Sequence, residues 1–384
     1  MIHDFAGAPD GSYPGGGLAF GVGSNAGSLF GTTATGGTGP DEGGTVFELT
    51  PPTVAGGAWT ETVLYNFPGA YVRQTGTGDP EGTLLIEPNG TIYGTTYGSC
   101  VGAATDLPTM FHMAPPSSAG GAWGFRTLFN FQYDPTMSVG GGARAEGVCP
   151  TGGLLQQGGA LFGTTFQGAS ACGDGGGCGA AYLLSPPADP GGVWTGTPLH
   201  AFTGPPDGAF PQAPLTAGPS GVFYGTTYIG GTGSVCGPEL DYPYGTGGCG
   251  TVFQLTPPSL PGGAWAETVI YSFSGTSGDG AVPVAGVTVG PNGVLYGTTQ
   301  YGGAATAAPC NVAVPGCGTI SQLTPPSAPG AAWTETVLYS FSGQNGDGAT
   351  PLAGLTLDRG NVLYGTTSAG GTAGAGTVFS LALN

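Results

Sequence analysis

Short runs of β-branched and aromatic residues, separated by Gly- and Pro-rich turns, extend through the whole chain and predict β-strands rather than helices. In one stretch the predicted strands cover residues 285–289, 294–299, 318–323 and 333–341. The first two are joined by Gly-Pro-Asn-Gly, whose Asn-Gly pair is a strong hairpin signal. Four short strands joined in this way predict one antiparallel four-stranded sheet.

This order of strands recurs six times. Its clearest marker is an aromatic residue followed by Gly-Thr-Thr, with the glycines at 31, 94, 163, 225, 297 and 365. A repeat of this size, running from end to end, is typical of propeller blades. We therefore predict a single all-β domain over residues 1–384, a six-bladed β-propeller of four-stranded antiparallel blades. The blades are expected at about residues 14–67, 82–131, 150–202, 211–273, 283–341, and 351–381 together with 1–5.

The fourth strand of each repeat is predicted to be the outer edge of its blade. It carries Glu61, Glu267 or Glu335 among apolar residues and Pro198 in the third repeat, which a central strand would not accommodate. The sequence ends after a third strand, and residues 2–5 align with residues 338–341. The N-terminal strand is therefore expected to complete the last blade.

Three motifs carry a family resemblance: LYGTT, GTVFxLTPP and WxETVLYxF. They resemble the GloVer-type tandem repeats of bacterial secreted and surface-anchored proteins, and the phasing PxxGLxxDxxGxLY is similar to that of NHL-type propellers. The resemblance implies an extracellular bacterial repeat protein. It brings no established activity and no catalytic residues.

Composition narrows the choice of partner and compartment. The formal net charge is −18 with only four basic residues, so the chain would be repelled by nucleic acid and by anionic membranes. No apolar run is long enough to span a membrane, and the first residues do not form a signal peptide. We expect a secreted monomer whose export signal has been removed.

Eight cysteines support an oxidising compartment. Three pairs each fall within one loop between a second and a third strand, and the remaining two cysteines fall in loops of adjacent blades. The predicted disulfides are Cys172–Cys178, Cys236–Cys249, Cys310–Cys317 and Cys100–Cys149. A zinc site at these cysteines is rejected because short Cys-x-x-Cys spacing and neighbouring histidines are missing.

An acidic residue precedes the inner strand of every repeat, usually as Asp-Gly-x-x-Pro. The series is Asp10, Asp79, Glu146, Asp207, Asp279 and Asp347. One interpretation is that each carboxylate caps its own turn. The alternative is an acidic ring that holds Ca²⁺ or polarises a sugar. No cofactor is required by the first interpretation, and Ca²⁺ is the ion that the alternative would bind.

Departures from the repeat are the candidates for function, because residues shared by all blades mainly build blades. On one face, called here the upper face, the expected catalytic candidates are Glu239, Asp241 and Asp207, and the expected ligand-binding residues are Tyr242, Tyr244, Phe210, Tyr133, Tyr71, Arg73 and Arg144. His3, His112 and His200 fall on outer strands of different blades, which argues against a histidine-centred catalytic or metal site.

Two classes of function remain open. Aromatic side chains beside carboxylates are suited to carbohydrate, so one class is an extracellular binding or scaffold module for carbohydrate or another extracellular ligand. The other is a polysaccharide-acting enzyme, a glycoside hydrolase or lyase, because glycoside hydrolysis needs only two suitably placed carboxylates.

Overall fold

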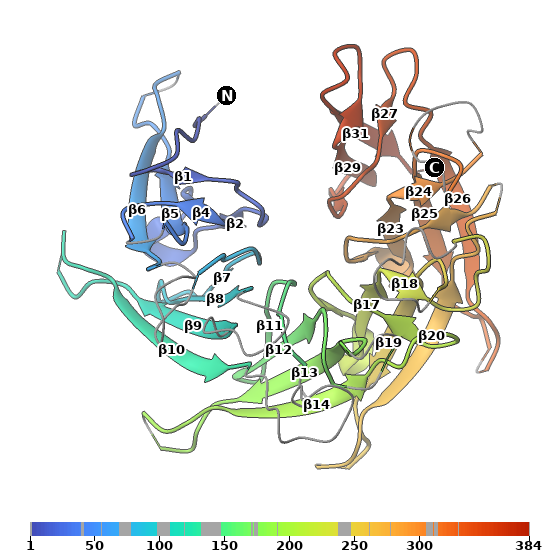
Figure 1. Cartoon of the computed structure of the whole chain (residues 1–384), viewed down its shortest axis with the longest axis horizontal. Helices are drawn as coiled ribbons and strands as arrows, with labels where there is room; N and C mark the ends of the chain where they lie inside the picture. The colour runs from blue at the N-terminus through green and yellow to red at the C-terminus, as the bar shows by residue number, and fades with distance from the viewer. Residues whose placement is uncertain are drawn as a thin grey trace. The chain divides into compact units, whose positions relative to one another are not determined.

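Six antiparallel sheets follow one another along the chain in the computed structural model (Figure 1). The structure describes residues 2–39, 42–54, 56–68, 78–97, 108–118, 120–131, 147–169, 172, 176–189, 191–236, 247–260, 262–276, 278–304, 310, 314–328 and 330–383. Within these ranges the helices are three short 3₁₀ turns, η1 (Gly23–Asn25), η2 (Pro219–Gly221) and η3 (Pro291–Gly293). The chain is an all-β six-bladed β-propeller, which confirms the predicted fold class.

Each of the first five blades has four strands in sequential order. Blades 1 and 2 consist of β2 (Ala19–Phe20), β3 (Leu29–Thr33), β5 (Thr45–Thr50) and β6 (Thr60–Asn66), then β7 (Leu85–Ile86), β8 (Ile92–Thr96), β9 (Thr109–Ala114) and β10 (Gly124–Asn130). Blade 3 consists of β11 (Leu155–Gln157), β12 (Ala160–Thr165), β13 (Ala180–Ser185) and β14 (Thr195–Ala201). Blades 4 and 5 consist of β16 (Thr216–Ala217), β17 (Phe223–Thr227), β19 (Thr251–Thr256) and β20 (Ala266–Ser272), then β22 (Thr288–Val289), β23 (Leu295–Thr299), β25 (Thr319–Thr324) and β26 (Thr334–Ser340).

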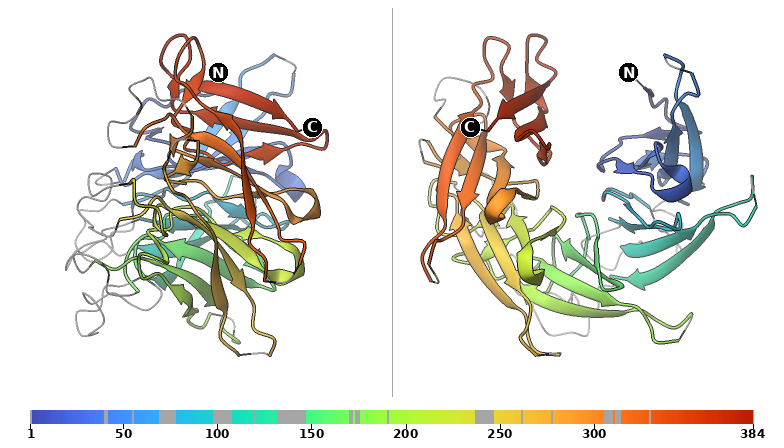
Figure 2. Two further views of the ribbon diagram at one scale, coloured as in Figure 1. Left: turned by 90° about the vertical axis from the view of Figure 1, so that its right-hand side faces the viewer. Right: turned by 180° about the vertical axis from the view of Figure 1, so that it is seen from behind.

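In blade 5 the predicted strand positions are close to the observed ones, except that the innermost strand is only two residues long. The predicted hairpin turn is η3, where Asn292 adopts a left-handed backbone with φ 58°. The third and fourth strands form the longest hairpins of the blades, which Figure 2 shows from two further sides.

Small two-stranded sheets accompany four of the blades and were not predicted. They pair β1 (Gly11–Ser12) with β4 (Thr35–Gly36), β15 (Gly208–Ala209) with β18 (Ile229–Gly230), β21 (Gly280–Ala281) with β24 (Tyr301–Gly302), and β27 (Gly348–Ala349) with β30 (Ala369–Gly370). One strand of each pair begins directly after the aspartate of the Asp-Gly turn. These sheets therefore hold Asp10, Asp207, Asp279 and Asp347 beside their own blades.

The last blade differs from its predicted form. It has three strands, β28 (Thr356–Leu357), β29 (Val362–Thr367) and β31 (Thr377–Ala382), and residues 2–5 belong to no strand. Residues 2–5 belong to the first unit and the last blade to the second, so the pairing of the N-terminal segment with β31 stays a prediction. On β31 the side chain of Val378 is 81% exposed, whereas its counterpart Val252 on β19 is 2% exposed.

The Gly-Thr-Thr motif has a packing role in the middle of each blade. Thr227 and Thr251, on neighbouring strands, share a buried hydrogen bond of 2.8 Å between their hydroxyls, and four other blades contain the same bond. In blade 4 the glycine lies under an aromatic ring, because a Cβ on Gly225 would come within 2.3 Å of Phe253. The motif therefore helps to build the sheet.

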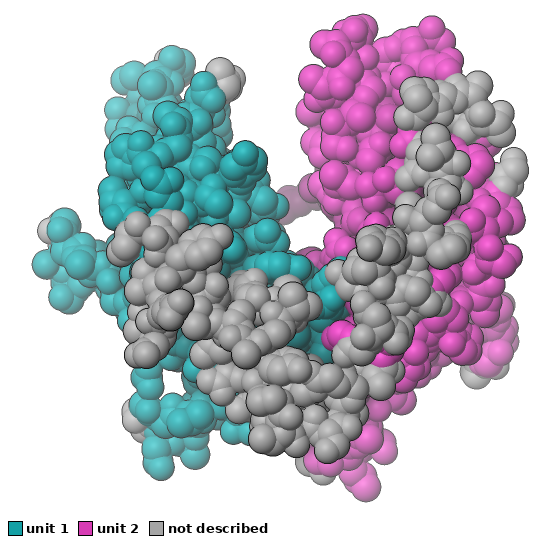
Figure 3. All heavy atoms as spheres, in the orientation of Figure 1, with its two compact units in different colours: residues 1–169, 181–198 teal, residues 170–180, 199–384 magenta. Residues whose placement is uncertain are grey.

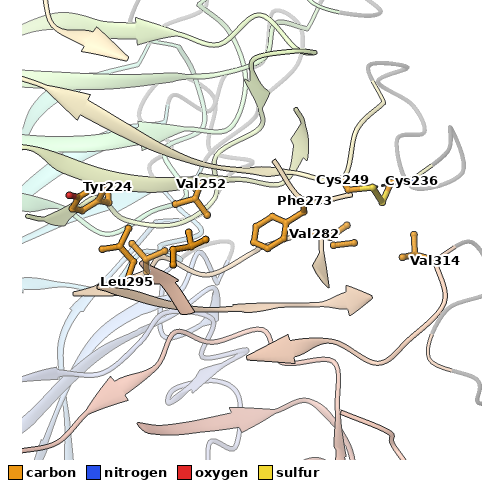
Figure 4. Packing of buried hydrophobic residues seen from close by; sticks show 11 residues of the cluster. Tyr224, Cys236, Cys249, Val252, Phe273, Val282, Leu295 and Val314 are labelled. Atoms are coloured by element: carbon orange, nitrogen blue, oxygen red, sulfur yellow. Dashed lines mark hydrogen bonds between the residues drawn. A yellow bond between two sulfur atoms is a disulfide. The ribbon is translucent and has the colours of Figure 1, made fainter. Parts of the chain in front are cut away.

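The chain divides into two compact units (Figure 3), residues 1–169 with 181–198 and residues 170–180 with 199–384. A core cluster of the first unit includes Phe30, Phe67 and Phe111. In the second unit, the cluster in Figure 4 joins Phe273 and Leu295 to the Cys236–Cys249 disulfide. Neighbouring blades within a unit thus share one apolar core.

Candidate functional site

The aspartate of the Asp-Gly-x-x-Pro sequence caps its own turn. Asp207 accepts hydrogen bonds on Oδ2 from the backbone N–H of Thr203 (3.0 Å) and its hydroxyl (3.1 Å), and on Oδ1 from the N–H of Gly208 (2.7 Å). Asp10, Asp279 and Asp347 each accept comparable bonds from the same two positions of their own turns. The turn-capping interpretation is confirmed for these four residues.

Hydrogen bonding also sets the acidity of Asp207 and Asp347. Burial acts to raise the pKa of Asp207, but the hydrogen bonds from His200, Gly208 and Thr203 outweigh it and hold the pKa below its usual value. Asp347 behaves in the same way. Carboxyls held ionised in this way are unsuited to the role of general acid near neutral pH.

An imidazole or phenol ring from the segment before each turn meets the capped aspartate. Nε2 of His200, on the outer strand β14, lies 3.0 Å from Oδ2 of Asp207. In the next blade the hydroxyl of Tyr271 donates to Oδ1 of Asp279 at 3.2 Å. His200 therefore takes the position that Tyr271 and Tyr339 occupy in the next two blades.

Glu267, on the outer strand β20, completes a three-residue cluster. Potential ligand atoms of His200, Asp207 and Glu267 all lie within 4.8 Å of one another, the one such group found among the described residues. The pKa of Glu267 is raised to about 7, mainly by burial; His200 opposes the increase and charge repulsion from Asp207 adds to it. A cluster of one imidazole and two carboxylates can share protons or hold a divalent cation.

A looser version of this cluster occurs in the first unit. Nε2 of His3 lies 3.4 Å from Oδ2 of Asp10, and burial together with Asp10 raises the pKa of Glu61. Sequence reasoning missed both clusters. In each cluster the glutamate comes from the outer strand of a blade and the histidine from the segment that precedes that blade. The signal that could have found them is that each such Glu comes one repeat after a His.

Asp79 was assigned to the wrong position of the turn. It has a left-handed backbone (φ 55°) and precedes Pro80, as Phe210 (φ 58°) precedes Pro211. The same left-handed residue before proline is found in all six repeats, at Tyr13, Asp79, Cys149, Phe210, Val282 and Thr350. Asp79 therefore corresponds to Phe210, and its repeat lacks an aspartate at the capping position.

Phe210 also requires a correction. Its side chain is 1% exposed, so in this structure it cannot stack on a sugar from the surface. The other predicted site residues lie outside the described ranges: Tyr71, Arg73, Tyr133, Arg144, Glu146, Glu239, Asp241, Tyr242 and Tyr244.

Three of the predicted disulfides are present, Cys172–Cys178, Cys236–Cys249 and Cys310–Cys317, with Cα–Cα distances of 5.4, 5.2 and 5.1 Å. Cys149 is also disulfide-bonded, and its predicted partner Cys100 lies outside the described residues. Among the described helices, none is long and apolar enough to cross a membrane.

The family comparison bears on the C-terminal part of the chain. Residues 241–384 match the Gloeobacter/Verrucomicrobia repeat. This match confirms the GloVer resemblance for that stretch. The matched residues include the LYGTT, GTVFxL and WxETVLYxF motifs of the last repeats. No curated protein matches the chain.

Solved structures similar to this chain include a Hadza microbial sialidase, Hz136, with 16% identity and a TM-score of 0.47, where the match covers 97% of this chain and 65% of that one. A GH93 α-L-arabinofuranosidase of Fusarium graminearum has 14% identity and a TM-score of 0.44, with coverage of 96% and 95%. A glucose dehydrogenase has 14% identity and a TM-score of 0.49, with coverage of 97% of both chains. These likenesses carry no argument about activity.

Proposed function

We propose that this protein is a secreted bacterial β-propeller that binds extracellular carbohydrate through its upper-face loops. The observation that carries the proposal is the Cys236–Cys249 disulfide, which closes the loop containing Glu239, Asp241, Tyr242 and Tyr244. Closing a loop reduces the number of conformations that a ligand would have to select, and this favours binding by preorganisation. Disulfides are also typical of oxidising, extracellular compartments.

The residues in this loop have the chemistry that sugar recognition needs. Tyrosine rings offer apolar faces to the C–H side of a sugar, and carboxylates accept hydrogen bonds from its hydroxyls. The net charge of −18 favours neutral glycans over polyanions, because an acidic polymer would be repelled.

A glycan array probed with the wild-type protein and with Tyr242→Ala tests the proposal. We expect binding to a neutral polysaccharide that weakens at least tenfold in Tyr242→Ala and in the double variant Cys236→Ser/Cys249→Ser. Leu260→Ala serves as a control, since Leu260 is 72% exposed and lies outside that loop. Absence of glycan binding would leave an inert scaffold as the better account.

Polysaccharide hydrolysis is the second candidate. The observation in its favour is that the environments of Asp207 and Glu267 move their pKa values in opposite directions, as in pairs of carboxylates that work as nucleophile and acid. The hydrogen bonds that Asp207 already accepts argue against it. A hydrolysis assay decides, because turnover that Asp207→Asn abolishes without loss of glycan binding would establish an enzyme.

A further inference from the structure

We propose that His200, Asp207 and Glu267 form a binding site for a divalent transition-metal ion, with Zn²⁺ as the ion used to test it. Nε2 of His200 and Oδ2 of Asp207 are 3.0 Å apart, and the potential ligand atoms of all three residues lie within 4.8 Å of one another. Two ligands about 2.0–2.1 Å from a tetrahedral zinc ion are roughly 3.3 Å apart. The imidazole and the aspartate therefore need almost no movement, and the glutamate needs a side-chain adjustment of about 1–2 Å.

The glutamate has an unused oxygen. Oε1 of Glu267 is shielded from solvent and has no hydrogen-bond partner among the described atoms. In the next blade, Oε1 of the corresponding Glu335 accepts a 2.6 Å hydrogen bond from the hydroxyl of Ser321. Since a shielded carboxylate oxygen without a partner is costly, a cation at the cluster would compensate the cost at Glu267.

The other two side chains are held in place by their surroundings. Thr203 and Gly208 donate to Asp207, and the edge of His200 packs on Phe202 with ring centroids 4.8 Å apart. Such outer contacts fix the orientation of metal ligands. One nitrogen and two carboxylate oxygens are a donor set for zinc and related ions, and they leave a fourth position for water.

The chain contains its own counterpart of the site in which a tyrosine replaces the histidine. Tyr271, Asp279 and Glu335 occupy the corresponding positions one blade later, and the Tyr271 ring packs on Phe273 much as His200 packs on Phe202. Burial and the nearby carboxylates raise the pKa of Tyr271, so its hydroxyl stays protonated and is a poor ligand. His200→Tyr therefore restores the ordinary residue of the repeat while removing the nitrogen ligand.

Zinc binding to the EDTA-treated and dialysed full chain, measured by calorimetry at pH 7.5, tests the proposal. We expect the wild type to bind one more zinc ion than His200→Tyr, with affinity for that ion reduced at least tenfold in Glu267→Gln. The second measurement is Co²⁺ absorption, where visible bands of a low-symmetry site should appear in the wild type and disappear on addition of Zn²⁺.

Zinc bound by other carboxylates of this acidic chain is the same in the wild type and in His200→Tyr. Subtracting the zinc bound by His200→Tyr from that bound by the wild type therefore leaves the zinc held by the cluster. Equal binding by the wild type and His200→Tyr, with no difference in the Co²⁺ spectrum, would overturn the proposal and leave the cluster as a hydrogen-bonded turn. If His200→Tyr does not fold, the comparison of the wild type with Glu267→Gln decides by the same criteria.

Discussion

The ring of Phe5 packs against the ring of Phe47, with centroids 5.0 Å apart and an interplanar angle of 62°. Phe202 makes the same contact with Phe253, at 5.0 Å and 62°. Phe202 follows the outer strand of one blade and packs on the next blade. Phe5 makes the equivalent contact with blade 1. The N-terminal segment thus makes the repeat's contacts with blade 1, although it belongs to no strand.

We expect Phe5→Ala to destabilise the protein by about 2 kcal/mol, roughly half the cost of removing a fully buried phenylalanine, because Phe5 is only half-buried. Urea unfolding measures this. Ile2→Ala is the control, since Ile2 is 44% exposed and should cost little. Equal stability of Phe5→Ala and wild type would mean that the contact is not maintained in solution.

The exposed edge of β31 gives a second test. Val378→Thr should change the free energy of unfolding by less than about 0.5 kcal/mol, because the side chain is 81% exposed. Val252→Thr, at the equivalent buried position, should cost at least about 1 kcal/mol by placing a hydroxyl in the core. A similar loss for Val378→Thr would indicate that a fourth strand covers this residue in solution, as the sequence predicts.

Local sequence patterns predict most of the fold. The Asn292 turn and the Asp207 cap depend on neighbours within a few residues, so the sequence alone predicts them. The cluster of His200 and Glu267 depends on how outer strands of successive blades approach each other, which no local pattern contains. Asp79 was misplaced because its charge was aligned with the series, whereas the proline that follows it marks its true position.

The glycine of the Gly-Thr-Thr motif provides a matched pair of substitutions. A Cβ at Gly225 would come within 2.3 Å of Phe253, whereas at Gly297 the nearest atom is Cγ1 of Val287, at 3.5 Å, because the ring is replaced by Ser321. Gly225→Ala is expected to cost about 1–3 kcal/mol through overpacking. Gly297→Ala should be nearly neutral or slightly stabilising. Thermal unfolding distinguishes the two variants. An equal loss of stability in both would show that the aromatic ring does not determine the cost of the substitution.

Asp347 is suited to a test of the turn caps, because it lies outside the histidine clusters. Its Oδ2 accepts 2.7 Å bonds from the N–H and the hydroxyl of Ser342, and its Oδ1 accepts a 2.8 Å bond from the N–H of Gly348. Burial acts to raise the pKa of Asp347, yet these bonds and one from Tyr339 lower it overall. The ionised form is therefore the one that stabilises the fold.

Asp347→Asn should lower the free energy of unfolding at pH 7 by about 1 kcal/mol, because the amide replaces charged acceptors with a weaker one. A lowered pKa in the folded state means that the stabilisation is complete above the ordinary carboxyl value of 3.8 and is lost as the pH falls through the folded value. The difference between the variant and the wild type should therefore be constant from pH 7 to pH 5 and shrink below pH 4. Urea unfolding at pH 7, 5, 3 and 2 measures it, with the exposed Asp4→Asn as the control. A stability difference that grows as the pH falls would have the opposite pH dependence. It would show that the protonated carboxyl, not the carboxylate, stabilises the turn.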